Sequence, residues 1–231
     1  MNVILFGATG MVGSAALIEC LDHPDVTRVL AIGRRSCGVS HGKLDELIHT
    51  DFLDYSGVQD RLTGYDACLF CLGVSSAGMS EEEYTRITYD FTMAAARALS
   101  ALNPGLTFCY LSGQGADGSE TGRIMWARVR GRLENHLLAL EDCTAWIFRP
   151  GFIQPVKGVR SATRLYAVAY ALAGPLFPIL DRLVPKAVTT SERVGLALIR
   201  VARQGAPKTR LENADINELA AAEREESAGR G

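Results

Sequence analysis

The sequence predicts a parallel, doubly wound α/β sheet, and three observations lead to that prediction. Short apolar runs alternate with helix-like segments through residues 1–153, as in chains built from strand–helix–strand units. A glycine-rich turn joins the first apolar run to the first helix-like segment. The length of 231 residues suits one domain of this class. We therefore expect a single domain over residues 1–231 with a small C-terminal subregion on the substrate side.

Each expected element follows from its own stretch of sequence. Strands are expected where apolar runs are short and bounded by turn residues: 2–8, 28–34, 47–49, 66–73, 106–113 and 144–151, with a late strand within 208–216. Helices are expected at 13–23, at 80–102, around 122–131 and at 189–205. Ser80 and Glu83 have the spacing of a capping box at the start of the second helix.

The part of the chain that follows the sheet core, residues 1–153, is expected to differ in character. Residues 154–218 should add C-terminal helices and the late strand, and residues 219–231 have little to bury and should fray. The apolar stretch 162–185 contains an uncharged run, 165–180, that is shorter than the roughly 20 residues of a membrane-spanning helix. A helix packed beside the sheet is the favoured reading, and peripheral membrane contact is the alternative.

Composition excludes several classes of protein. The chain has 24 Lys and Arg against 26 Asp and Glu, so no positive excess exists to hold a nucleic acid. The N-terminus carries no secretory signal pattern, which leads us to expect a cytosolic location. The six cysteines are scattered, as expected for reduced thiols. The four histidines show no metal-ligand spacing, and we expect no metal site.

Cys68 and Cys71 match the spacing of a metal or redox motif, but they fall in an expected strand. Side chains alternate between the two faces of a strand, so residues three apart point to opposite sides. The two thiols are therefore interpreted as core residues.

The turn after the first strand has the features of a phosphate-binding loop. Gly7, Gly10 and Gly13 stand between strand and helix, where one glycine makes the tight turn, one admits the pyrophosphate and one lets helix and strand pack closely. The start of the helix then offers free N–H groups to the phosphates. We expect a dinucleotide to contact these glycines and the residues between them, Thr9, Met11 and Val12.

The end of the second strand indicates which dinucleotide. An NAD-binding protein would place Asp or Glu there to hold the ribose hydroxyls, whereas this chain has Arg34 and Arg35. A guanidinium suits the 2′-phosphate of NADP(H) and can stack on adenine. NADP(H) is therefore expected in preference to NAD(H).

The glycine spacing resembles the atypical branch of the short-chain dehydrogenase/reductase superfamily, an NAD(P)-binding Rossmann fold. The resemblance implies that Asp51 and Phe52 lie at the adenine ring. It implies that Cys71, Leu72 and Gly73 pass the adenine ribose and pyrophosphate. It also implies that the backbone of Pro150, Gly151 and Phe152 meets the nicotinamide amide.

The group most similar in its motifs is the Tat-interacting oxidoreductase-like and NAD-dependent epimerase/dehydratase-like proteins, with their bacterial relatives. These carry a serine after the fifth strand and a Tyr-x-x-x-Lys pair on the next helix. Here the resemblance implies that Ser112 is that serine, and that Trp126 and Arg130 stand at the tyrosine and the lysine. An indole cannot act as a titrating acid, while Arg130 can still hold the ribose.

Two functions remain open from the sequence. The first is an NADP(H)-dependent oxidoreductase without the Tyr-x-x-x-Lys pair, acting on a substrate electrophilic enough to take its proton from solvent. The alternative is a non-catalytic NADP(H)-sensing regulator or partner-binding protein, with Trp126 filling the nicotinamide side of the pocket. The sequence carries no code for a substrate.

Overall fold

The structure is a computed structural model, and it describes residues 1–158, 184 and 186–229. A seven-stranded sheet lies at its centre in the order β3-β2-β1-β4-β5-β6-β9, and every strand pair in it is parallel. Its strands are β1 (Asn2–Phe6), β2 (Arg28–Gly33), β3 (Leu44–Ile48), β4 (Ala67–Phe70), β5 (Thr107–Leu111), β6 (Thr144–Arg149) and β9 (Arg210–Glu212). This is the doubly wound order of dinucleotide-binding sheets, so the predicted fold class is confirmed.

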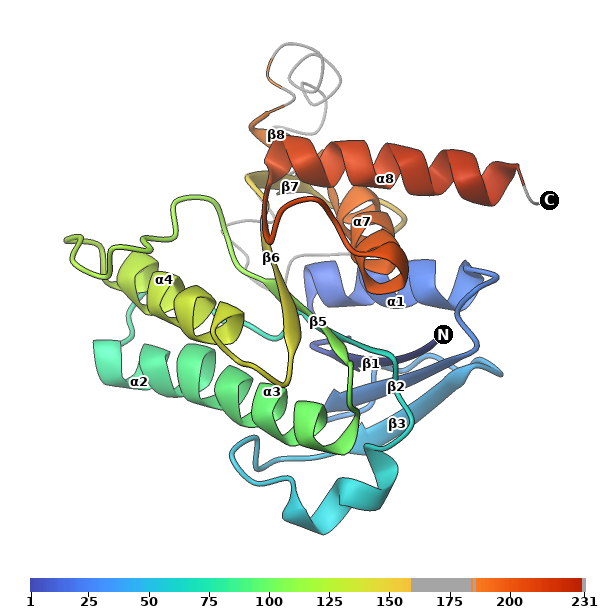
Figure 1. The fold of residues 1–231 in the computed structure, drawn as a ribbon, viewed down its shortest axis with the longest axis horizontal. Coiled ribbons are helices and arrows are strands. Elements are labelled where there is room, and N and C mark those ends of the chain that lie inside the picture. The colour runs from blue at the N-terminus through green and yellow to red at the C-terminus, as the bar shows by residue number, and fades with distance from the viewer. Residues whose placement is uncertain (159–183, 185, 230–231) are drawn as a thin grey trace.

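Helices cover both faces of the sheet (Figure 1). One layer holds α1 (Met11–Asp22), α7 (Ser191–Gln204) and α8 (Asn213–Ala228). The other layer holds η1 (Ser56–Arg61), α2 (Glu81–Thr85), η2 (Arg86–Asp90), α3 (Phe91–Leu102) and α4 (Met125–Leu138). Strand order reverses between β1 and β4, and ligands of open α/β sheets bind at the carboxyl ends of strands beside such a reversal.

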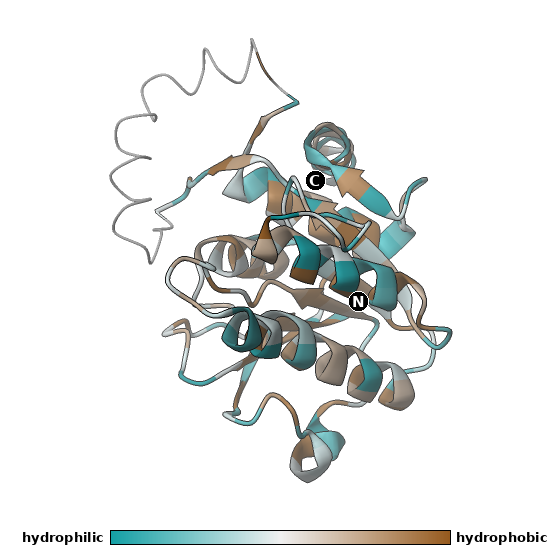
Figure 2. Cartoon of the chain, turned by 90° about the vertical axis from the view of Figure 1, so that its left-hand side faces the viewer, coloured by the Kyte–Doolittle hydropathy of each residue, from teal (hydrophilic) through white to brown (hydrophobic). Residues whose placement is uncertain are grey.

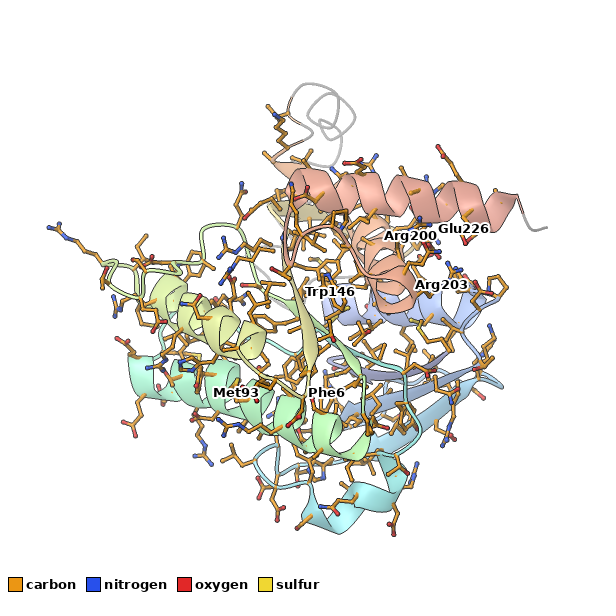
Figure 3. The ribbon with its side chains drawn as sticks, in the orientation of Figure 1. Phe6, Met93, Trp146, Arg200, Arg203 and Glu226 are labelled. Atoms are coloured by element: carbon orange, nitrogen blue, oxygen red, sulfur yellow. The ribbon has the colours of Figure 1, made fainter. Side chains whose placement is uncertain are left out.

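The alternation of side chains along each strand divides the core in two. Val3 and Leu5 of β1 pack against the α1 and α7 layer, whereas Ile4 and Phe6 pack against the α3 and α4 layer. In Figure 2 brown strands lie between helices that carry teal, white and brown residues, and Figure 3 labels Phe6 of β1 and Met93 of α3. Apolar burial on both faces accounts for strands that read as continuous hydrophobic runs.

Most element boundaries lie close to those predicted, and the exceptions have local causes. The helix expected at 80–102 begins with the predicted capping box, in which the Ser80 Oγ accepts from the N–H of Glu83 and the Glu83 carboxylate accepts from the N–H of Ser80. It is then interrupted by the π-helical turn η2 before α3. The expected strand at 47–49 is β3, which starts three residues earlier at Leu44.

A second, two-stranded parallel sheet was not predicted. It pairs β7 (Phe152–Gln154) with β8 (Val188–Thr190), directly after the end of β6. Strands of three residues are too short to show a period of two, so sequence periodicity offers no signal for them.

The expectation of a frayed tail over 219–231 is wrong for most of its length. Residues up to Ala228 continue α8, and the Glu223 side chain is completely buried. Its carboxylate is paired with Arg200, Arg203 and His23, and Figure 3 shows both arginines between α7 and α8. Polar composition suggested fraying, but α8 buries Ile216 and Ala220 in the core and pairs its buried carboxylate with arginines of α7.

The apolar run 165–180, with its alternative of peripheral membrane contact, lies outside the described residues. Within the described ranges, none of the helices combines the length and the apolar character needed to cross a bilayer.

Candidate functional site

The predicted phosphate loop is a cradle of backbone. Gly7 has a φ of +81°, and a Cβ there would lie 2.7 Å from the carbonyl of Cys71 at the end of β4. A Cβ on Gly13 would lie 2.0 Å from the Gly7 oxygen, so only glycine lets α1 pack this closely on the loop. The N–H of Gly10 donates to the Gly7 oxygen at 2.8 Å and closes the turn.

The N-terminus of α1 is open to an anion. Gly10 is the N-cap residue, no side chain caps the helix, and its first turn contains no acidic residue. Thr9 is exposed at the tip of the loop, while the Val12 side chain is buried in the core. Met11 packs against that core as well, so both residues offer their backbone N–H groups. A helix start of this kind fits the pyrophosphate of a dinucleotide.

The end of β2 presents the two predicted arginines to solvent. Arg34 and Arg35 follow Gly33 directly and are both exposed. The nearby Glu46 carboxylate is occupied instead by the Ser36 hydroxyl at 2.8 Å and the Cys37 N–H at 2.7 Å. In the part of the chain that the structure describes, neither arginine makes an ion pair, so both guanidinium groups are available to a ligand.

Asp51 and Phe52 follow β3, as the resemblance implies, but the Phe52 side chain belongs to the core. Its ring is 3% exposed and lies 5.5 Å from the ring of Phe91 and 6.3 Å from that of Phe6, centroid to centroid. Asp51 is exposed and accepts from the Leu53 N–H. The Phe52 ring is therefore not free to meet an adenine ring, whereas the exposed Asp51 is accessible to a ligand.

Cys71, Leu72 and Gly73 leave the end of β4 beside the phosphate loop, with the Cys71 N–H donating to the Phe6 oxygen at 3.1 Å. Cys68 packs in the α3 and α4 layer and Cys71 against the opposite layer. Both thiols are free, and burial raises the pKa of Cys71 to about 12. The two thiols lie on opposite sides of the sheet, as predicted, with Cys68 buried in the core and Cys71 partly buried against it.

A cleft of about 560 Å³ opens beyond the carboxyl ends of the strands. Its lining comes from the loop after β4, from α2, from the loop after β5, from α4 and from the end of β6. These residues are Val74, Ser75, Ser76, Tyr84, Gly113, Gln114, Trp126, Arg130, Pro150 and Gly151. The cleft thus brings together Trp126, Arg130, Pro150 and Gly151 of the predicted site.

Arg130 lines the cleft and lies between the ends of two neighbouring strands. Its two terminal nitrogens, Nη1 and Nη2, lie 3.5 Å and 3.8 Å from where Cβ atoms would stand on Gly113 and Gly73. The guanidinium therefore spans the ends of β5 and β4. Burial alone would lower the pKa of Arg130, but the neighbouring Tyr110 and Tyr84 contribute to an opposing effect that raises it. The group stays charged.

Trp126 lines the cleft without filling it. The indole Cη2 lies 3.4 Å from where a Cβ would stand on Gly115, so the ring rests against the loop after β5. The close approach of this loop to α4 depends on Gly131, where a Cβ would lie 1.8 Å from the Asp117 oxygen. The indole leaves open space beside Arg130.

The prediction of Ser112 as a catalytic residue does not agree with the geometry. Ser112 is 5% exposed, does not line the cleft, and donates from Oγ to Glu134 at 2.5 Å. Glu134 is completely buried on α4 and is paired with Arg149. Ser112 continues the β5 face of Phe108 and Tyr110, so its side chain points to α4, and Gly113 occupies the cleft. We assign Ser112 to this buried polar cluster.

The remaining predicted residues lie at the rim of the site. Gly151 allows a close crossing, because a Cβ there would lie 2.3 Å from the Ala187 oxygen. The Phe152 N–H donates to that oxygen, and Phe152 is the first residue of β7.

Among the described residues, no group of three His, Cys, Asp or Glu side chains is arranged to hold a metal. The ring of His136 is hydrogen-bonded to the hydroxyl of Tyr89.

Tyr84 was missed as a site residue. It comes from α2, is 1% exposed, and accepts from Arg130 Nε at Oη over 2.9 Å. Ser75, Ser76 and Gln114 also line the cleft. Tyr84 and Arg130 are 46 positions apart, and a pairing over that distance gives no sequence signal.

The chain is similar in sequence to known proteins. A model of the NAD dependent epimerase/dehydratase family matches residues 3–123. The curated protein fmp52 of Emericella nidulans is 30% identical over 207 residues, covering 86% of this chain and 85% of the relative. FMP52 of Meyerozyma guilliermondii is 28% identical over 200 residues, covering 81% and 83%.

These relatives correct one expectation. Both are named as mitochondrial, which contradicts the cytosolic location expected from the N-terminal sequence. The N-terminal pattern on which that expectation was based does not distinguish the cytosol from a mitochondrion.

Solved structures agree with the fold. The Bordetella bronchiseptica enzyme WbmF in complex with NAD+ has a TM-score of 0.68 at 15% identity, covering all of this chain and 79% of that one. The Helicobacter pylori ADP-L-glycero-D-manno-heptose-6-epimerase has a TM-score of 0.66 at 13% identity, covering 97% and 81%. At such identities the likeness concerns the fold alone.

Proposed function

The chain belongs to the NAD dependent epimerase/dehydratase family, and from that premise we propose that it is an NADP(H)-dependent oxidoreductase of a small electrophilic substrate. The observation that carries the proposal is the open cleft of about 560 Å³ beside Arg130, at the end of the sheet where the phosphate loop also lies. A cleft that stays open next to the cation has room for a substrate.

Preference for NADP(H) is supported at the other end of the site. Arg34 and Arg35 are exposed at the carboxyl end of β2, where an acidic residue would repel a 2′-phosphate. A phosphate between two guanidinium groups forms charge-assisted hydrogen bonds, which are stronger than neutral ones.

The chain's own residues have separable tasks in this function. The loop at Gly7 to Gly13 and the start of α1 hold the pyrophosphate, and Arg130 holds the ribose next to the nicotinamide. The cofactor supplies a hydride when bound. Pro150, Gly151 and Trp126 line the cleft in which the substrate would lie.

The rival function is an NADP(H) sensor without chemistry, in which the Trp126 indole would cover the nicotinamide. The orientation of the indole against Gly115 favours the enzyme instead. The two readings predict different results for one experiment.

That experiment measures binding and hydride transfer on the same preparation. Energy transfer from Trp126 to the reduced nicotinamide reports binding, with Trp126→Phe as the control that separates it from the second tryptophan, Trp146. NADPH labelled with deuterium at C4 is then mixed with 4-nitrobenzaldehyde, 9,10-phenanthrenequinone or a free flavin. We expect tighter binding of NADPH than of NADH, deuterium in the 4-nitrobenzyl alcohol, and acceptor-dependent oxidation of NADPH with the quinone or the flavin, whose reduced forms exchange the label with water. Tight binding with no label in the alcohol and no acceptor-dependent oxidation of NADPH would establish the sensor.

A further inference from the structure

One tyrosine stands in the cleft although the position expected for the catalytic tyrosine holds Trp126. Of the tyrosines in the described part of the chain, Tyr84 is the one that lines the cleft. Tyr110 lies on β5 in the core, where burial raises its pKa to about 12. Tyr89 is paired with His136 and stacked under Arg132.

The hydrogen bond between Tyr84 and Arg130 has a direction that matters for chemistry. Arg130 Nε donates and the Tyr84 Oη accepts, at 2.9 Å. A guanidinium has only donors, so the hydroxyl proton of Tyr84 is left free to be donated elsewhere. The same cation lies close enough to stabilise a phenolate.

The local backbone holds Tyr84 at this place. The capping box of Ser80 and Glu83 fixes the first turn of α2, one residue before it. The π-helical turn η2 follows from Arg86 to Asp90 and changes the register before α3, whose Met93, Ala96 and Leu99 pack on the sheet. Such π turns occur frequently at functional sites.

We propose that Tyr84, carried on α2, is the proton donor for carbonyl reduction in this protein and that Arg130 is its charged partner. The proposal rests on the proposed function. Hydride from the reduced nicotinamide forms a bond to the carbonyl carbon, and the carbonyl π electrons move to the oxygen. That oxygen takes the proton from Tyr84 Oη, the phenolate is balanced by Arg130, and water returns the proton. The tyrosine and the cation thus come from two helices instead of one.

The test compares an acceptor that needs a proton donor with one that does not. Reduction of 4-nitrobenzaldehyde forms a strongly basic alkoxide, whereas 9,10-phenanthrenequinone accepts hydride as a stabilised oxyanion that solvent can protonate. Tyr84→Phe should lower kcat/KM for the aldehyde by about 100- to 10,000-fold. It should leave quinone reduction and NADPH binding within a few fold of the unaltered protein.

The matched control is Tyr89→Phe, which removes a tyrosine hydroxyl five residues further along the same helical segment and outside the cleft lining. We expect it to change neither reaction. Tyr84→3-fluorotyrosine keeps the hydroxyl and the fold while making the phenol more acidic. Aldehyde reduction needs the protonated phenol and is lost as pH rises, so this variant should move that loss to lower pH.

The same fluorine atom also reports ligand binding near residue 84 without catalytic turnover. The ¹⁹F resonance at position 84 should shift when NADP+ and 4-nitrobenzyl alcohol are added, whereas fluorotyrosine at position 89 should not respond. Two outcomes would overturn the proton-donor role of Tyr84 and leave the proposed function standing. One is an equal loss of activity toward both acceptors in Tyr84→Phe, and the other is an unchanged pH profile and resonance in the fluorinated protein. NADPH binding with no hydride transfer by the unaltered protein would overturn the proposed function and the donor role with it.

Discussion

The two ends of the candidate site are built in different ways. At the phosphate end, backbone atoms of one continuous stretch, Gly7 to Gly13, form the cradle. At the other end, where we propose that the nicotinamide binds (the nicotinamide end), the groups are side chains carried by separate elements. Tyr84 lies on α2, Trp126 and Arg130 lie on α4, and Gln114 lies on the loop after β5. The first end depends on local geometry and the second on tertiary packing.

This difference teaches where function can change without loss of the fold. A cradle of backbone tolerates no side chain at its close crossings, because the partner atoms are themselves backbone. The side chains of a pocket can change, and with them its chemistry, while the fold beneath them stays the same. We therefore expect substitutions at the phosphate end to act on folding and binding together, and those at the nicotinamide end to act on chemistry.

The largest effect is expected at Gly13. Gly13→Ala places a Cβ 2.0 Å from the Gly7 oxygen, so α1 or the loop must move, which should lower the free energy of unfolding by about 3 kcal/mol. NADPH binding should be lost as well. Urea unfolding and the energy-transfer assay measure the two effects. Gly57→Ala, at an exposed position with no atom within 4 Å of the added Cβ, is the control and should change little.

If Gly13→Ala still bound NADPH, the contrast between the two ends of the site would fail, because the phosphate loop would then be able to adapt to a side chain. A stability loss in Gly57→Ala of similar size would point instead to a general cost of adding a methyl group.

The next effect concerns the support under the nicotinamide end. Glu134 is completely buried, accepts from Ser112, and is paired with Arg149. Glu134→Gln removes the anion and should lower the free energy of unfolding by about 2 kcal/mol, the range of a hydrogen bond to a charged group. The loss is moderated because Arg149 retains a second partner, Glu212, 3.2 Å away.

Glu212→Gln is the matched control for that variant, since the Glu212 side chain is 49% exposed and exposed pairs contribute little. Thermal unfolding monitored by circular dichroism compares the two. Equal stability losses would contradict a special role for the buried member.

How much the sequence could predict follows the same division. The glycines and the Ser80 capping box were predicted because each depends on residues within a few positions of it. Ser112 was misassigned because the resemblance does not say to which side of β5 the hydroxyl turns. Tyr84 was missed because its role depends on a hydrogen bond from Arg130, which is 46 residues away in the sequence. The α8 helix was missed because its buried Glu223 is stabilised by arginines of α7.

An effect of similar size, but confined to binding, is expected at the end of the site where we propose that the adenosine binds. Replacing Arg34 and Arg35 together by alanine removes two exposed cations and should raise the Kd for NADPH by about 10- to 100-fold, or roughly 1.4–2.7 kcal/mol. Affinity for NADH should be nearly unchanged. Calorimetric titration with both cofactors measures the ratio, and equal losses for both would exclude a 2′-phosphate contact.

The smallest effect is expected in the loop that covers α4, and it depends on pH. Hydrogen bonds from Ser119 and from the Gly122 N–H hold the pKa of Asp117 below its ordinary value. A carboxyl whose pKa is lowered by folding stabilises the folded loop above its unfolded pKa, and the contribution is lost as pH falls through the folded pKa. The affected window therefore begins near the ordinary pKa of 3.8 and extends below it.

Asp117→Asn should abolish this dependence, because an amide does not titrate in that range. The loop contacts the Trp126 indole at Gly115, so the indole N–H resonance of Trp126 reports whether the loop is ordered. Comparison with Trp126→Phe identifies that resonance. In the unaltered protein that resonance should move as pH falls through the window, and in Asp117→Asn it should stay constant. A resonance that moves equally in both would place the pH dependence elsewhere, and would separate the order of this loop from the charge of Asp117.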